Sequence, residues 1–174
     1  FDYRGYGLSE GSPSEAGLYL DGEASMGYLM ERQRSDGASS DIVLFGRSLG
    51  AAVAVKIASS YSVRAVILES PFTAISALAK HMYPLLPSLF VKKLFEARYD
   101  SLSLMNTLRD PLLVIHGDQD GIVPIEMGRQ LYEAATVPKV FNPVKGADHN
   151  DTYIVGGTAY FLQIKNFIED SSHR

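Results

Sequence analysis

One serine of the chain lies in a setting that favours nucleophilic chemistry. Ser48 is the middle residue of Gly46-Arg47-Ser48-Leu49-Gly50, which follows the apolar run 42–45 and precedes the alanine- and valine-rich run 51–58. A strand, a tight turn with glycines at both ends and then a helix form the context that the G-x-S-x-G motif requires. The serine oxygen would then lie at the carboxyl edge of a sheet, above the amino end of a helix, where a developing negative charge is favoured. This pattern predicts Ser48 as a nucleophile; the alternative is a glycine-flanked strand-to-helix turn of any α/β protein.

A nucleophilic serine needs a base that takes its proton and an acid that orients the base. When the serine stands in such a turn, the chain order is serine, then aspartate or glutamate, then histidine. Among the four histidines, His149 lies in a polar turn between the last strand-like run and the terminal helix, so we predict it as the base. We assign His81 to a helix surface, His173 to a solvated tail, and His116 to a strand end where its ring bonds the backbone.

Three carboxylates are candidates for the acid. Asp118 and Asp120 both follow the apolar run 112–115, on the loop before the strand that leads to His149. Asp120 lies deeper in that loop and can turn back toward the histidine, so we prefer it. Asp118 can instead cap the turn through its own backbone. Glu69 ends an earlier strand-like run, and we interpret it as a strand-end carboxylate bonded to loop amides.

The composition is that of a globular domain. Hydrophobic types make up 46% and charged types 21% of the 174 residues, which is enough for one domain with a sizeable core. The net charge of −4 gives no electrostatic reason to expect nucleic acid as a partner. Cysteine is absent, which excludes disulfides and thiolate metal ligands. No signal peptide is visible, no apolar run reaches the roughly 18 residues of a membrane span, and the predicted chemistry needs no cofactor or metal.

Strand-like and helix-like segments alternate along the chain. This alternation predicts an α/β fold, a mostly parallel sheet flanked by helices, in a single domain over residues 1–174. Ser12 and Glu15 suggest a capping box with Pro13 at the first helical position. Prolines in the last strand favour a sheet edge. The predicted strands are 42–45, 63–68, 111–115 and 137–144, and the predicted helices run from Ser12 to about residue 36, then 51–60, 124–135 and 158–168.

The segment 72–108 does not fit this alternation. It is apolar with two proline breaks, and it follows the strand that ends at Glu69. It is therefore close in sequence to the carboxyl edge of the sheet. It is either a small cap that lines a lipid-like acyl pocket or touches a membrane, or a helix-loop-helix that packs on the sheet, and the sequence leaves both alternatives open.

These motifs together resemble the α/β-hydrolase superfamily, and within it the group of α/β-hydrolase domain-containing protein 13 and its fungal and plant relatives. The resemblance covers essentially the whole chain. It implies that Ser48, Asp120 and His149 are the triad of a serine hydrolase that cleaves an acyl ester or thioester, with the backbone amide of Leu49 in the oxyanion hole. The alternative is a catalytically silent binding or scaffold protein. The resemblance rests on Asp2-Tyr3-Arg4-Gly5-Tyr6-Gly7, on Pro13 to Asp21, on Phe45 to Gly50, on His116-Gly117-Asp118-Gln119-Asp120 with Val123-Pro124, and on His149-Asn150-Asp151-Thr152.

The resemblance also implies partners and an incomplete amino end. Related proteins remove acyl groups from lipids or from palmitoylated cysteines, so we expect a small-molecule or lipid-like acyl substrate, or an acylated protein. Family members carry further strands, a second oxyanion donor and often a membrane-anchoring helix upstream of the turn at 2–7. Because Phe1-Asp2-Tyr3 resembles the end of a strand, we expect a piece of a longer protein whose membrane contact, if any, lies upstream, and we leave its location open. Expressed alone, residues 1–174 are expected to aggregate or stay inactive.

Overall fold

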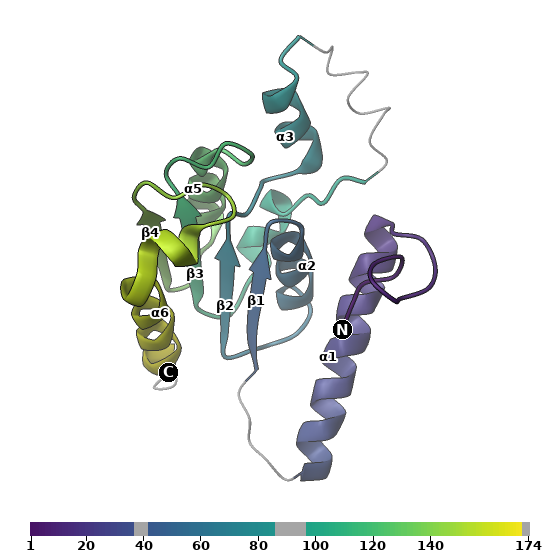
Figure 1. Ribbon diagram of the computed structural model, residues 1–174. Coiled ribbons are helices and arrows are strands. Elements are labelled where there is room, and N and C mark those ends of the chain that lie inside the picture. The colour runs from purple at the N-terminus through teal and green to yellow at the C-terminus, as the bar shows by residue number, and fades with distance from the viewer. Residues whose placement is uncertain (37–41, 86–96, 172–174) are drawn as a thin grey trace. The chain divides into compact units, whose positions relative to one another are not determined.

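A computed structural model describes residues 1–36, 42–85 and 97–171 (Figure 1). The chain forms two compact units, Phe1–Asp41 and Ile42–Arg174. The candidate residues for chemistry all belong to the second unit.

The first unit is built around the helix α1, Glu15–Asp36. The hydroxyl of Ser14 accepts a hydrogen bond of 3.1 Å from the backbone N–H of Gly17, so Ser14 caps the helix. The predicted capping box beginning at Ser12 was therefore wrong by two residues. Residues 1–3 were expected to end a strand, and in the structure they belong to no strand. Arg4 fixes the turn before the helix, since its Nη2 lies 2.7 Å from Oδ1 of Asp21.

The second unit contains a parallel sheet. Its strands are β1 (Val43–Arg47), β2 (Ala65–Glu69), β3 (Leu112–Gly117) and β4 (Lys139–Val144), in the order β1-β2-β3-β4. Each neighbouring pair is parallel, so all four carboxyl ends meet at one edge of the sheet, the upper edge in Figure 1. The predicted α/β class with a parallel sheet is confirmed. β4 lies at an edge, as its prolines predicted.

The two central strands are buried along their whole length. Every residue of β2 and β3 is buried, as expected for parallel strands covered on both faces. The helix α6 (Thr152–Asp170) packs on the face that carries Ile67, Leu113 and Ile115. In Figure 1, α6 lies in front of the sheet and α5 (Ile125–Ala134) behind it.

Two segments differ from the prediction. The last helix was expected to begin near residue 158, but α6 begins at Thr152 and is broken at Gly157, where φ is 50°. The segment 72–108 contains the helix α3 (Ile75–Met82) and the 3₁₀ helix η1 (Leu102–Thr107). Residues 86–96, which hold much of the apolar sequence of the proposed cap, lie outside the described residues, so the choice between cap and packed hairpin stays open.

The helices that the structure describes were compared with the length and hydropathy of a membrane span. Among residues 1–36, 42–85 and 97–171, none is both long enough and apolar enough to cross a bilayer.

Candidate active site

Ser48 occupies a strained turn between β1 and the helix α2 (Leu49–Ala58). Its backbone has φ 51° and ψ −116°, a conformation that residues with a side chain rarely adopt. Gly46 makes this turn possible, because a Cβ at that position would lie 2.4 Å from the carbonyl oxygen of Gly50 and 2.7 Å from Cα of Ala51. Strand and helix therefore approach each other more closely than any residue other than glycine would allow. Such strain is typical of functional positions.

The backbone amides around Ser48 have different roles. The N–H of Ser48 donates to the carbonyl of Glu69 at 2.9 Å, which ties the turn to the end of β2. Leu49 is the first residue of α2, so its N–H has no partner four residues earlier within the helix. An amide of this kind, at the amino end of a helix, is suited to bind a negative oxygen.

The predicted acid and base form a hydrogen-bonded pair. Nδ1 of His149 lies 2.8 Å from Oδ2 of Asp120, and the two side chains are 7% and 0% exposed. A carboxylate has no proton to give, so the ring nitrogen Nδ1 carries the hydrogen and donates it. The other nitrogen, Nε2, is then left as a proton acceptor, which is the state that a general base requires.

The carboxylate of Asp120 is held in its ionised form. Burial favours the neutral acid, but hydrogen bonds from His116, His149 and the amides of Val123 and Ile122 outweigh it and hold the pKa of Asp120 well below its ordinary value. The two amides donate to Oδ1 at 2.8 and 3.0 Å. One oxygen of Asp120 is thus fixed by the backbone, and the other faces His149.

The other carboxylates considered as acids bond elsewhere. Oδ1 of Asp118 accepts the backbone N–H of Gly146 at 2.6 Å rather than capping its own turn. Glu69 was expected to bond loop amides, and instead its carboxylate accepts the hydroxyls of Thr152 and Tyr160. Within the described residues, neither acid forms a hydrogen bond with the ring of His149.

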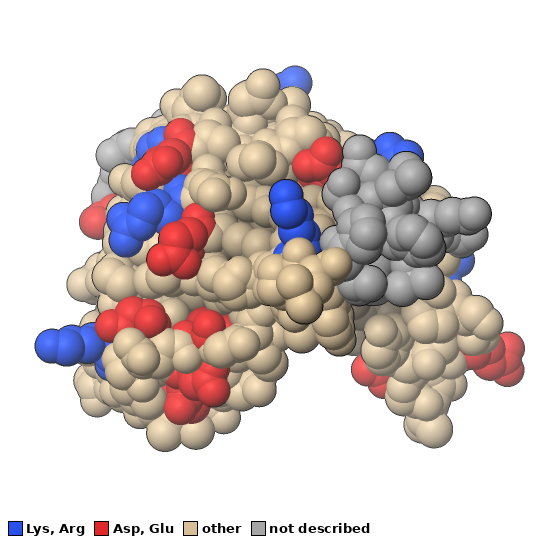
Figure 2. Space-filling model, turned by 90° about the horizontal axis from the view of Figure 1, so that it is seen from above, with Lys and Arg blue, Asp and Glu red and all other residues tan. Residues whose placement is uncertain are grey.

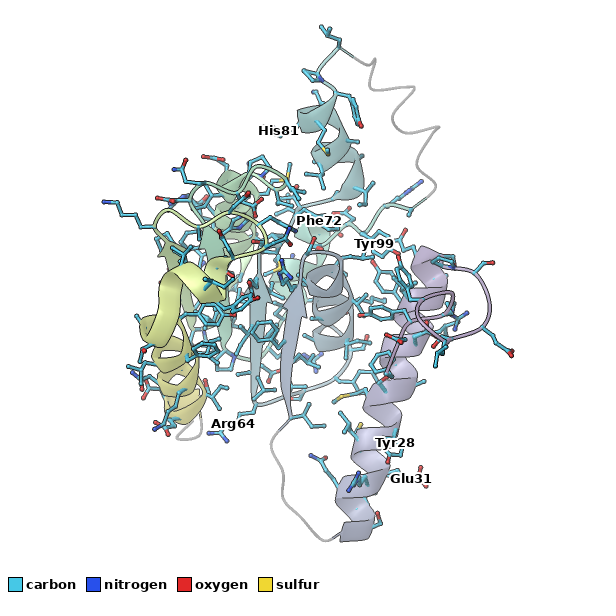
Figure 3. The ribbon with its side chains drawn as sticks, viewed as in Figure 1. Tyr28, Glu31, Arg64, Phe72, His81 and Tyr99 are labelled. Atoms are coloured by element: carbon cyan, nitrogen blue, oxygen red, sulfur yellow. The ribbon has the colours of Figure 1, made fainter. Side chains whose placement is uncertain are left out.

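The remaining histidines follow their predicted settings where the structure describes them. Nε2 of the fully buried His116 lies 2.9 Å from the carbonyl of Val123, a backbone bond at the end of β3 as predicted. The same nitrogen lies 3.4 Å from Oδ2 of Asp120, a contact that the sequence did not predict. His81 is exposed on α3 (Figure 3). His173 lies outside the described residues.

Asp148 is a residue that the sequence analysis missed. Its Oδ1 accepts the N–H of Gly121 at 2.9 Å and the N–H of His149 at 2.7 Å. One carboxylate oxygen therefore joins the loop of the acid to the loop of the base. These two backbone bonds, the bond from Gly121 first, lower the pKa of Asp148, so it stays ionised. An aspartate directly before the candidate base was the only sequence signal for this role.

One expected contact is not formed. Within the part of the chain that the structure describes, the hydroxyl of Ser48 makes no hydrogen bond to His149, and it does not cap α2. Hydrogen bonds between nucleophile and base are often long in free enzymes and shorten when substrate binds. The Ser48–His149 bond therefore stays a prediction. The described residues also contain no group of three histidines or carboxylates arranged to hold a metal ion.

Comparison with known proteins assigns the chain to a family. The Hydrolase_4 family model, described as serine aminopeptidase, S33, matches residues 1–106. An uncharacterized protein of Mycobacterium tuberculosis is 38% identical over 172 residues, which cover 99% of this chain and 59% of that protein. The α/β-hydrolase domain-containing protein 17C of Xenopus tropicalis is 35% identical over 170 residues, 97% of this chain and 51% of that protein. The chain thus spans little more than half the length of these relatives.

The fold has solved counterparts. An esterase of Pyrococcus furiosus superposes with a TM-score of 0.76 at 24% identity, covering 97% of this chain and 67% of that one. A likeness at this identity shows the fold alone. The relatives do not single out the group of domain-containing protein 13, so that narrower assignment stays a prediction. The family match and the fold together show that the chain belongs to the serine aminopeptidase S33 family of the α/β-hydrolase superfamily, a family of hydrolases.

Proposed function

We propose that this chain carries the Ser48–Asp120–His149 triad of a serine hydrolase that cleaves an acyl ester or thioester through an acyl-enzyme. The observation that carries the proposal is the buried 2.8 Å bond between Asp120 and Nδ1 of His149. Both residues follow strands whose carboxyl ends share an edge with the turn of Ser48. The strained φ of Ser48 supports a nucleophile elbow at that turn.

The reaction would proceed in two halves. Oγ of Ser48 attacks the acyl carbonyl carbon while Nε2 of His149 takes the hydroxyl proton. The N–H of Leu49 stabilises the negative oxygen of the tetrahedral intermediate. His149 then gives the proton to the leaving alcohol or thiol, and the acyl group stays on Ser48. Water repeats the sequence, releases the acid and restores the serine, while Asp120 remains ionised and stabilises the protonated ring.

Apolar side chains next to the candidate triad support an apolar acyl group. Ile122 on the acid loop is exposed, as are Tyr153 and Ile154 on the first turn of α6, just after the base. Figure 2 looks down on the carboxyl edge of the sheet, where charged groups of both signs lie among a larger area of other side chains. Exposed apolar groups beside a catalytic edge favour a substrate with a hydrocarbon acyl chain over a charged one.

The test is turnover of p-nitrophenyl esters of increasing acyl length by the full-length protein. Ser48→Ala should lower kcat by about 10³-fold or more, as removal of one triad member does. Ser70→Ala is the matched control. Like Ser48, Ser70 directly follows a strand and has a positive φ, of 45°. Its buried hydroxyl has no hydrogen-bond partner among the described residues. An amino-acid p-nitroanilide added to the panel distinguishes an aminopeptidase, the activity in the family description, from an esterase.

The alternative, a silent binding protein that keeps the fold, predicts a different result. Turnover would then be equal in the wild type and in Ser48→Ala on every substrate. Equal turnover would exclude the proposal, and a loss confined to Ser48→Ala would support it.

A further inference from the structure

Arg47, the residue directly before the candidate nucleophile, binds the backbone of the candidate base. Its Nη2 donates to the carbonyl oxygen of His149 at 2.8 Å and also to Oδ1 of Asn150. Arg47 directly precedes Ser48 and is 102 positions from His149 in the chain. One side chain at the end of β1 therefore binds the main chain of the loop after β4, although two strands lie between them in the sheet.

Glu69 completes this connection from the next strand. It is the register partner of Arg47 at the end of β2, and its Oε1 lies 3.6 Å from Nε of Arg47. The same carboxylate accepts the hydroxyl of Thr152, which comes three residues after His149, and at 2.9 Å the hydroxyl of Tyr160. The loop of the base is thus bound from both sides, through its carbonyl by Arg47 and through the start of α6 by Glu69.

The charges and hydrogen bonds of Arg47, Glu69 and Tyr160 compensate one another. Glu69 is only 3% exposed, and a buried carboxylate is costly unless it is paired and hydrogen-bonded. Each of its two oxygens accepts a hydrogen bond from a hydroxyl, and the guanidinium of Arg47 supplies the opposite charge. Burial, and then the hydrogen bond to Glu69, raise the pKa of Tyr160, so this hydroxyl keeps its proton and remains a donor. Removal of Arg47 would leave the carboxylate without its counter-charge.

We propose that Arg47 and Glu69 are positioning residues that hold the main chain of His149 at a fixed place relative to Ser48. This inference rests on the proposed function and assigns separate roles to the residues that bind His149. Asp120 binds the ring and sets its rotation and tautomer, whereas Arg47 and Glu69 fix the backbone from which the ring projects. A shift of the base by about 1 Å can cost on the order of 10²-fold in rate, so the backbone position of His149 directly affects turnover.

Arg47→Met tests the role, with Arg64→Met as its matched control. Arg64 also binds a carbonyl of α6, since its Nη2 donates to the carbonyl of Ile168 at 2.7 Å. This bond lies at the other end of the helix, and Figure 3 shows Arg64 at the lower end of the sheet, away from the carboxyl edge. We expect Arg47→Met to lower kcat on a short p-nitrophenyl ester by about 10- to 100-fold with KM nearly unchanged. Arg64→Met should keep the kcat of the wild type.

Two further variants keep the test decisive if Arg47→Met does not fold. Arg47→Lys keeps the charge beside Glu69 but lacks the forked guanidinium that also reaches His149, so it should fold and still lose kcat. Glu69→Gln should also lower kcat, because the Arg47–Glu69 ion pair loses its negative charge. Wild-type kcat in folded Arg47→Lys and Glu69→Gln, or an equal loss in Arg64→Met, would overturn the inference.

A measurement of the ring itself separates this inference from the proposed function. The proton on Nδ1 of His149 can be followed by NMR in protein labelled with ¹⁵N-histidine. We expect this resonance to be shifted or broadened in Arg47→Lys and unchanged in Arg64→Met. If it is unchanged in both variants, the positioning role is wrong even where Ser48→Ala abolishes turnover. If it responds as expected while Ser48→Ala keeps wild-type turnover, the proposed function fails and the structural role of Arg47 stands.

Discussion

Oδ2 of Asp120 and Nδ1 of His149 are joined by a 2.8 Å hydrogen bond between loops that follow neighbouring strands. The other oxygen of Asp120 accepts two backbone amides of its own loop. The carboxylate therefore cannot rotate away from the ring without losing three hydrogen bonds. This fixed pair is the basis of the first two predictions.

Asp120→Asn should lower kcat by about 10³- to 10⁴-fold, because an amide can stabilise the wrong tautomer of His149. Asp118→Asn is the control, since its retained carbonyl oxygen can still accept the N–H of Gly146. The measurement is steady-state ester hydrolysis by both variants. A larger loss in Asp118→Asn than in Asp120→Asn would show that the acid has been assigned to the wrong residue.

Stability should depend on pH through Asp120. Its pKa is lowered by folding from an ordinary value of about 3.9. The stabilisation is therefore fully present above that value and is lost as the pH falls toward the lower folded-state pKa. Urea unfolding between about pH 6 and pH 3 should show a steeper loss of unfolding free energy in the wild type than in Asp120→Asn. Identical slopes would mean that folding does not change the ionisation of Asp120.

The strain at Ser48 predicts that the order of stability of the glycine and alanine variants is reversed between Ser48 and Ser59. At φ 51°, glycine avoids a cost of about 1–3 kcal/mol that any side chain incurs, so Ser48→Gly should be more stable than Ser48→Ala. At Ser59, where φ is −70°, the order should be the opposite, with Ser59→Ala the more stable. Chemical denaturation of the four variants measures both differences. Alanine more stable than glycine at both positions would remove the strained turn from the account.

Gly128 should be intolerant of any side chain. A Cβ there would lie 2.4 Å from Nδ1 of the buried His116, whose other nitrogen approaches Asp120. Gly128→Ala should therefore cost about 1–3 kcal/mol through overpacking, and kcat should fall because His116 must shift. At Gly27, inside α1, an added Cβ would meet no described atom within 4 Å apart from its chain neighbours and the backbone of its own helix, so Gly27→Ala should instead stabilise by about 0.5–1 kcal/mol. Equal stabilities of the two variants would contradict this packing.

The sequence predicted the sheet well because its signals are local. β2 and β3 are continuous apolar runs, and parallel strands buried on both faces produce such runs. The start of α6 was missed because Gly156 and Gly157 interrupt the pattern, and the helix continues across a break at Gly157 that periodicity does not predict.

The site was predictable only in part. Glycine spacing and chain order identified Ser48, Asp120 and His149 as candidates, since these signals follow from the strand-turn-helix context. The bonds of Arg47 and Asp148 to the loop of the base were not foreseen, because both depend on which loops meet at the sheet edge. Glu69 was predicted as a strand-end carboxylate bonded to loop amides, and this was wrong about its partners, because the hydroxyls that it accepts come from α6, far along the sequence.

The most direct test of the central claim is the site of covalent attachment by a fluorophosphonate probe. The full-length protein would be treated with the probe, digested and analysed by peptide mass spectrometry, with Ser70→Ala and Asp120→Asn treated in parallel. We expect the adduct on Ser48 in the wild type and in Ser70→Ala, and much slower labelling of Asp120→Asn, because an unactivated serine reacts poorly. No adduct on Ser48 in folded protein, or an adduct on another serine, would contradict the account.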